Sequence, residues 1–125
     1  MNQRLARFQW IRKRSIYQRV FKEGQRFQEQ LFDVWVLSLP RDVFFELNKI
    51  ESPTFGVVVS RQVNRLATQR NLWKRRILEA LKRNRSSFPK NTFVVIRVRK
   101  STKRVAVAYR FIEQELEAVI RKNFI

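Results

Sequence analysis

The sequence contains no cysteine and no histidine, and only two of its 125 residues are glycine. Without cysteine and histidine the chain can form no disulfide, no thiolate or imidazole metal site, no cysteine nucleophile and no serine–histidine triad. The two glycines, Gly24 and Gly56, lie too far apart to build a glycine-rich phosphate loop. No apolar run approaches the roughly 20 residues of a membrane span, and residues 1–18 lack the apolar core of a signal peptide. We therefore expect a cytoplasmic protein.

Acidic residues are also few, because ten Asp and Glu stand against 28 Lys and Arg, and the formal net charge is +18. The carboxylates are too scattered to form an acid–base pair or a metal site, so we assign no catalytic residue and no metal ligand. So much charge of one sign favours a polyanionic partner. Nucleic acid is the first candidate, since phosphate neutralisation supplies most non-specific binding free energy. An anionic membrane surface and a merely solvated basic protein are the alternatives.

Hydrophobic residues make up 44% of the chain and include 11 Phe and 3 Trp, which argues against a disordered basic tail. We expect a single RNA-binding domain over residues 1–125, with residues 1–11 as a flexible arm. Hydrophobic periodicity predicts three helices and four strands, with residues 42–53 as a loop or the ragged end of a hairpin. The helices cover residues 15–22, 68–82 and 106–122, and the strands cover a short segment around Phe27 and residues 31–39, 54–60 and 92–98.

The predicted order, α-β-β-β-α-β-α, indicates an α+β fold, a two-layer α-β sandwich with a mostly antiparallel sheet. The strands over residues 54–60 and 92–98 flank the central helix, so we expect them to pair in parallel around a crossover. On a helical wheel Trp73 lies on the apolar face of that helix, Arg75 lies on the opposite face, and Lys74 lies between them.

Basic residues are densest over residues 61–76, at the entry and first turns of the central helix. Arg and Asn at such a place hold phosphates and base edges, and the backbone N–H groups of the helix start add positive potential. The alternative is a solvated basic face. The helix dipole opposes cations near its N-terminus, and only Glu79 lies within the helix to offset them, so a phosphate-bearing partner is favoured.

Three aromatic residues form the second candidate site. Tyr17 and Phe21 lie four residues apart on one helical face, and Trp35 lies on the face of its strand opposite Val34 and Val36. Such side chains stack on unpaired bases. The alternative for the same three residues is core packing, and periodicity alone favours it.

Two segments, residues 15–27 (SIYQRVFKEGQRF) and 56–84 (GVVVSRQVNRLATQRNLWKRRILEALKRN), resemble the protein subunit of bacterial ribonuclease P. The element order extends the resemblance over residues 12–122. The resemblance implies a left-handed crossover between two parallel strands. It also implies a ribonucleoprotein endonuclease in which the RNA subunit, with Mg²⁺ held mainly by that RNA, removes the 5′ leader of precursor tRNA. The protein subunit is not itself catalytic, and its implied partners are the ribonuclease P RNA and precursor tRNA, with no membrane and no DNA expected.

The resemblance also assigns roles to individual residues. Arg70 and Asn71 match the start of the family's Arg-Asn-Arg motif, whose third position is Leu72 here. Leu78 stands where a later family Arg occurs, and Arg76 lies half a turn away as a substitute. The implied RNA-binding residues are Arg61, Arg65, Arg70, Asn71, Arg75 and Arg76. The implied leader cleft consists of Tyr17, Phe21 and Trp35, with Lys74 at its edge.

Other functions remain open from the sequence alone. A structural ribosomal or general RNA-binding protein with a similar sandwich would have the same charge, but it has no need of an exposed aromatic cleft. A stand-alone nuclease conflicts with the absence of histidine and of a carboxylate cluster. A membrane-surface protein conflicts with the predicted strand content.

Overall fold

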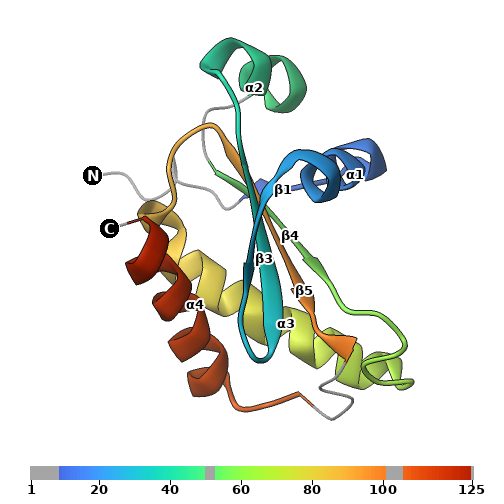
Figure 1. The fold of residues 1–125 in the computed structure, drawn as a ribbon. Coiled ribbons are helices and arrows are strands. Elements are labelled where there is room, and N and C mark those ends of the chain that lie inside the picture. The colour runs from blue at the N-terminus through green and yellow to red at the C-terminus, as the bar shows by residue number, and fades with distance from the viewer. Residues whose placement is uncertain (1–8, 50–52, 101–105, 125) are drawn as a thin grey trace.

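The computed structural model describes residues 9–49, 53–100 and 106–124. Its helices and strands form a mixed α+β arrangement around a single sheet (Figure 1). In chain order they are β1 (Gln9–Trp10), α1 (Arg14–Glu23), β2 (Gln25–Gln28), β3 (Phe32–Ser38), α2 (Arg41–Asn48), β4 (Thr54–Val58), α3 (Ala67–Asn84), the 3-10 turn η2 (Arg85–Ser87), β5 (Thr92–Val98) and α4 (Tyr109–Asn123). The predicted α+β class and the order α-β-β-β-α-β-α are confirmed, and β1 and α2 are additions to them.

The five strands form one sheet in the order β1-β4-β5-β3-β2. Strand β3 pairs antiparallel with β2 and β5, whereas β4 pairs in parallel with β5 and with β1. The register aligns Trp35 of β3 and Gly56 of β4 with the same residue of β5, Val95. The row two residues further toward the carboxyl end of β5 contains Asp33, Arg97 and Val58. Because side chains alternate along a strand, both rows lie on one face of the sheet.

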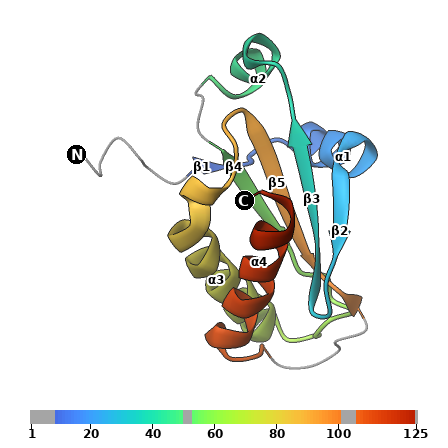
Figure 2. The same cartoon turned by 60° about the vertical axis from the view of Figure 1, so that its left-hand side comes forward.

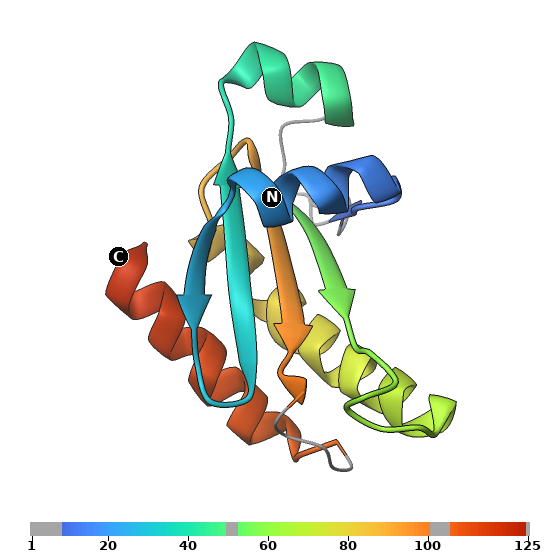
Figure 3. The same cartoon turned by 45° about the vertical axis from the view of Figure 1, so that its right-hand side comes forward.

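The connection between β4 and β5 is a left-handed crossover, as the resemblance implies. In Figure 3 both strands run downward with β4 to the right of β5, and α3 passes behind the sheet. The chain thus leaves the lower end of β4, returns upward along α3 and enters β5 on the left. Crossovers between parallel strands are right-handed in almost all proteins, so pairing and periodicity alone do not predict this hand.

Helices α3 and α4 lie side by side on one face of the sheet, and α1 crosses the other face near one end (Figures 2 and 3). The buried core under α3 and α4 includes Phe32, Val34, Trp73 and Ile77, and Leu116 is buried there from α4. This confirms the apolar face predicted for the central helix. A second buried cluster lies under α1, and α2 adds Phe44 to it.

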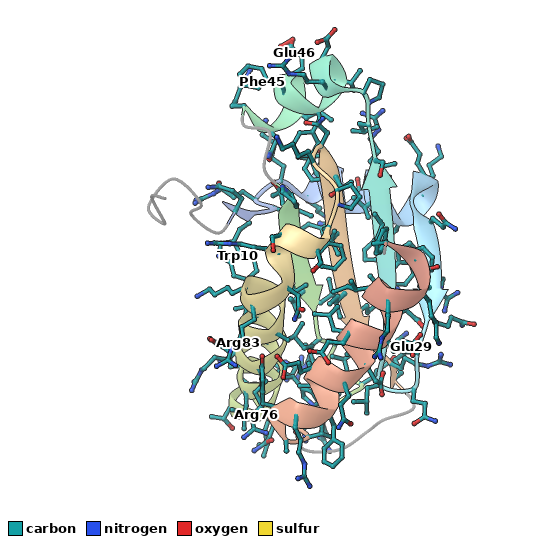
Figure 4. The ribbon with its side chains drawn as sticks, turned by 90° about the vertical axis from the view of Figure 1, so that its left-hand side faces the viewer. Trp10, Glu29, Phe45, Glu46, Arg76 and Arg83 are labelled. Atoms are coloured by element: carbon teal, nitrogen blue, oxygen red, sulfur yellow. The ribbon has the colours of Figure 1, made fainter. Side chains whose placement is uncertain are left out.

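The segment predicted as a loop over residues 42–53 contains helix α2, so that prediction is wrong for its first half. Pro40 precedes the first turn, where a missing N–H is harmless, and Asp42 in that turn favours the positive end of the helix dipole. Phe44 is fully buried and Leu47, three residues on, packs against the same cluster. The helix ends at Lys49, which adopts a left-handed conformation with φ 67°. Phe45 and Glu46 project from the outer side of α2 (Figure 4).

The first described residues belong to the sheet and not to an arm. Strand β1 pairs in parallel with β4, and the Ile11 N–H donates to the Phe55 carbonyl oxygen at 2.8 Å. Ile11 is also buried under α1. Strand β1 has only two residues, Gln9 and Trp10, which are too few to show a period in the sequence. Residues 1–8, the rest of the predicted arm, lie outside the described residues.

Candidate nucleic-acid interface

The three aromatic residues predicted as a cleft meet on the face of the sheet that α1 crosses. The rings of Phe21 and Trp35 touch edge to face, with centroids 4.9 Å apart. One turn earlier in α1, the Tyr17 ring lies over Gly56, where a Cβ would come within 2.5 Å of the Tyr17 hydroxyl oxygen. Because the predicted cleft falls on Tyr17, Phe21, Trp35 and Gly56, we use the name α1 groove for this arrangement of residues.

Exposure divides the aromatic residues of the α1 groove into two kinds. Trp35 is only 6% exposed and belongs to the buried cluster under α1. Tyr17 and Phe21 are half-buried, and burial raises the pKa of the Tyr17 hydroxyl above its ordinary value. Accessible ring surface is therefore found on Tyr17 and Phe21, and Trp35 packs against Phe21 from the sheet.

Two arginines, neither of them predicted from the sequence, cover the remainder of Trp35. The guanidinium carbon of Arg97 lies 4.6 Å from the centroid of the Trp35 ring and 5.5 Å from that of Phe21. The guanidinium carbon of Arg26 lies 5.2 Å from the Trp35 centroid. Arg97 interrupts the apolar run of β5, which is a visible signal, but its position beside Trp35 depends on the strand register.

A buried carboxylate organises the arginines at this end of the sheet. The Asp33 side chain is 5% exposed and accepts a hydrogen bond from Arg26 Nη2 at 2.8 Å. It also accepts from Arg99 Nη1 at 3.4 Å, and the same nitrogen donates to the Glu29 carbonyl oxygen at 3.2 Å. Asp33 thus holds two guanidinium groups in place beside the α1 groove.

The second candidate region is the left-handed crossover, where several cations face solvent. Arg61 and Arg65 lie in the bend over residues 61–66, and Lys74 and Arg75 lie on α3; all four are exposed. Within the described ranges, no hydrogen bond, ion pair or ring contact engages these four side chains. We call them the crossover cations. Asn71 is likewise exposed on α3.

Arg70 shapes the bend that carries Arg61 and Arg65. Its Nη1 donates to the carbonyl oxygens of Asn64 at 3.1 Å and Arg65 at 2.8 Å. The Asn64 side chain also closes the bend, because its Oδ1 accepts the Leu66 N–H at 2.9 Å. The bend therefore needs no left-handed residue, and the described residues with positive φ lie elsewhere.

Arg76 has a comparable structural role at the other flank of α3. Its Nη1 donates to the carbonyl oxygens of Ala106 at 3.2 Å and Val107 at 2.7 Å, which fastens the segment leading into α4 (Figure 4). Gln69 supports the same segment, because its Oε1 accepts the Ala106 N–H at 3.1 Å. Both Arg70 and Arg76 retain further N–H donors, since a guanidinium carries five.

Comparison with known proteins identifies the family of this chain. The family model described as Ribonuclease P matches residues 5–123. This chain belongs to the ribonuclease P protein family. The ribonuclease P protein component of Thermotoga maritima is 31% identical over 100 residues, which cover 80% of this chain and 77% of that protein. The corresponding protein of Thermotoga sp. strain RQ2 matches with the same identity and coverage.

Solved structures of ribonuclease P proteins share the fold. The Staphylococcus aureus protein superposes with a TM-score of 0.73 at 25% identity, covering 95% of this chain and 100% of that chain. The Thermotoga maritima protein superposes with a TM-score of 0.71 at 26% identity, covering 91% of this chain and 96% of that chain. The family is that of the protein subunit of a ribonucleoprotein nuclease, so membership implies an RNA partner.

Leu72 and Leu78 stand where the ribonuclease P family has arginine. Both leucine side chains are half-buried on α3. Lys74 lies on a helix that covers the opposite face of the sheet from α1. Its predicted place at the edge of the aromatic cleft stays a prediction. None of the helices in the described parts of the chain has the length and apolar content of a membrane span.

Proposed function

We propose that this chain is the protein subunit of a bacterial ribonuclease P in the cytoplasm. It binds the catalytic RNA through the crossover and the 5′ leader of precursor tRNA in the α1 groove, and thereby assists Mg²⁺-dependent removal of the leader. The observation that carries the proposal is the pairing of two features on one sheet. The crossover cations have no partner among the described residues, and Tyr17 and Phe21 present ring surface beside Trp35, over which Arg26 and Arg97 lie. A general RNA-binding protein needs the first surface and has no use for the second.

The crossover cations neutralise phosphates of the RNA in this proposal. Arg61, Arg65 and Arg75 are exposed, and Asn71 is exposed on α3 one turn before Arg75, so that phosphate oxygens and base edges can be reached together. Arg70 and Arg76 hold the surrounding backbone with Nη1 and direct their remaining donors to RNA. Because phosphate contacts release counterions, binding through this surface depends strongly on salt.

The α1 groove holds the leader in this proposal. Aromatic faces stack on any base, so Tyr17 and Phe21 accept many leader sequences, as a processor of all precursor tRNAs requires. Lys74 lies on the α3 side of the sheet, so we count it with the crossover cations and not with the α1 groove.

When bound, Mg²⁺ would activate a water as the nucleophile and would stabilise the leaving oxygen of phosphodiester cleavage. In the described residues, no three acidic side chains gather into a metal site. Asp33, the most buried of the described carboxylates, is already paired with Arg26 and Arg99. The described residues therefore do not fit a protein-bound Mg²⁺, and we assign the ion to the RNA. The chain's own part is to bind and orient.

The test is leader cleavage by a bacterial ribonuclease P RNA at low Mg²⁺, with and without the purified chain. We expect the chain to stimulate cleavage by the RNA and, when treated with ribonuclease, to cleave nothing alone. Arg61→Ala and Arg75→Ala should each lower the slope of log affinity against log salt by about 0.7–0.9. Arg110→Ala, at an exposed arginine of α4, is the matched control. No stimulation, or equal affinity for precursor and mature tRNA, would contradict the proposal and favour a general RNA-binding protein.

A further inference from the structure

A hollow of about 580 Å³ lies between the start of α4 and the turn that joins β2 to β3 (Figure 2). We call it the α4 hollow, and it is lined by Gln30, Leu31, residues 106–108, Phe111, Gln114 and Glu115. It lies on the face of the sheet that α4 covers, opposite α1, and it shares no residue with the α1 groove or the crossover cations. Its volume falls within the range of small-ligand sites, so it is large enough for a side chain of a partner.

The walls of the α4 hollow are mostly apolar. Leu31 is buried, and residues 106–108 (Ala-Val-Ala) add small apolar side chains. Phe111 is 44% exposed, which is unusual for a large apolar side chain in the described residues. Two arginines touch these walls from outside and do not line the hollow: Arg76 bonds to carbonyl oxygens of the segment 106–108, and Arg110 lies over the Phe111 ring at 4.9 Å. The apolar walls favour a ligand with an apolar part of its own.

Glu115 brings a carboxylate into this apolar setting. Its two oxygens accept the Leu31 N–H, at 2.9 and 3.1 Å, which holds the carboxylate against the turn. Among the described residues, no cation forms an ion pair with it. Burial raises the pKa of Glu115 against the opposing effect of the Leu31 N–H, and the charge of nearby Glu29 raises it further. The carboxylate therefore lacks a positive partner, and it has acceptor positions left for one.

The charges beside the hollow differ from those of the rest of this basic chain. Helix α4 carries Glu113, Glu115 and Glu117, three of the ten acidic residues in the sequence. Glu29 lies beside α4 on the turn (Figure 4), and its ion pair with Lys122 at 3.8 Å is weak because that lysine is 67% exposed. Carboxylates in and beside the hollow repel phosphate groups and attract a cation.

A guanidinium group matches this combination of carboxylate and apolar walls. It is planar and weakly hydrated, so it enters apolar surroundings more readily than an ammonium group, and it pairs with a carboxylate through two parallel N–H···O bonds. Its remaining donors can be accepted by the side-chain oxygens of Gln30 and Gln114, which accept no hydrogen bond within the described ranges. Apolar residues on either side of an arginine would cover Phe111 and the segment 106–108, which a free cation leaves exposed.

We propose that the α4 hollow binds an arginine side chain of a protein partner. The guanidinium pairs with Glu115, and the apolar neighbours of the arginine cover Phe111 and residues 106–108. The site goes beyond the proposed function, because it uses neither the α1 groove nor the crossover cations. Strand β2 is the edge of the sheet away from β4, so the hollow beside its turn and the crossover that follows β4 lie at different edges of the sheet.

The first test uses two capped pentapeptides, acetyl-Gly-Leu-Arg-Leu-Gly-amide and the same peptide with citrulline in place of arginine. Citrulline keeps the shape of the side chain and removes its charge. Binding to the full chain is followed by the NMR shifts of the backbone amides of Leu31 and residues 106–108. We expect the arginine peptide to shift these amides and the citrulline peptide to bind roughly 10- to 150-fold more weakly, because it lacks a charge-assisted bond. Equal affinities, or shifts confined to other residues, would overturn the proposal.

The second test repeats the titration with variants of the hollow. Glu115→Gln keeps an acceptor for the Leu31 N–H and removes the charge, so it should lose the preference for arginine over citrulline and melt like the wild type. Phe111→Ala, at an exposed side chain, should weaken binding of the arginine peptide about tenfold. Glu117→Gln is the matched control, since it removes an equal charge from an exposed position of α4 that does not line the hollow. An unchanged preference for arginine in Glu115→Gln would overturn the site.

Two further measurements distinguish other ligands from a protein partner. Benzamidine is a planar cation without peptide flanks, and its binding at the hollow without binding of the arginine peptide would overturn the protein partner in favour of a free small cation. A loss of precursor-tRNA affinity in Glu115→Gln would overturn it in favour of RNA. Failure of the peptide titrations leaves the proposed function standing, since that function depends on the α1 groove and the crossover cations.

Discussion

The α1 groove and the crossover both collect cations, but they use them in opposite ways. In the groove, Arg26 and Arg97 lie over Trp35, and Asp33 pairs with Arg26. At the crossover, Arg61 and Arg75 are exposed and, across the described ranges, have no partner in the protein. The first arrangement favours stacking at short range, which salt screens little, and the second favours phosphate neutralisation, which salt weakens steeply. The high net charge therefore comes from two kinds of cationic surface, and substitutions can distinguish one from the other.

The largest expected effect concerns Trp35, which the sequence offered either as a cleft residue or as a core residue. Since Trp35 is 6% exposed, we expect Trp35→Ala to lower the free energy of unfolding by about 3–5 kcal/mol. Phe21→Ala, at a half-buried site, should cost less stability and lose affinity for precursor tRNA only. Denaturant unfolding and tRNA binding measure both. If Trp35→Ala melts normally and loses precursor binding alone, the arginines move aside and the leader stacks on Trp35 itself.

The next largest expected effect is a difference in stability between variants of Arg75 and Arg76, two neighbouring arginines of α3. Arg76→Ala removes two hydrogen bonds to the backbone before α4 and should cost about 2–3 kcal/mol of unfolding free energy. Arg75→Ala, at an exposed side chain, should change stability by no more than about 0.5 kcal/mol and reduce the salt dependence of RNA binding. Each variant is the other's control in chemical unfolding and in salt titration. Equal stability of the two proteins would show that the bonds of Arg76 contribute nothing to the fold.

Much of the fold follows from periodicity, because long amphipathic segments bury one face. The apolar face of α3 and the parallel pairing of β4 with β5 are both confirmed. Helix α2 was not predicted because eight residues with one buried and one partly buried apolar position, Phe44 and Leu47, give a weak periodic signal. Pro40 and Asp42 are typical of the start of a helix, but the same residue types are equally typical of turns.

The interface was harder to predict, because sequence type does not reveal what a side chain already contacts. Arg70 and Arg76 look like Arg61 and Arg75 in the sequence, yet the first two bond to backbone carbonyls. Arg97 joins Trp35 only through the register of β3 with β5, which no local pattern encodes. Tertiary pairing therefore decides which cations shape the fold and which remain available to RNA.

The smallest expected effect tests the floor of the α1 groove at Gly56. A Cβ at Gly56 would lie 2.5 Å from the Tyr17 hydroxyl oxygen and 2.6 Å from Cε1, so the Tyr17 ring must swing away. Because the ring is the far end of a side chain, Gly56→Ala should cost only about 1 kcal/mol of unfolding free energy. Precursor affinity should fall to that of Tyr17→Ala, and the double variant should lose no more than Tyr17→Ala alone. Gly24→Ala is the contrasting control, since its Cβ would meet the Val20 carbonyl oxygen at 2.6 Å, and truncating Tyr17 relieves nothing there. Additive losses of precursor affinity in the double variant would mean that Tyr17 does not bind the leader from its place over Gly56.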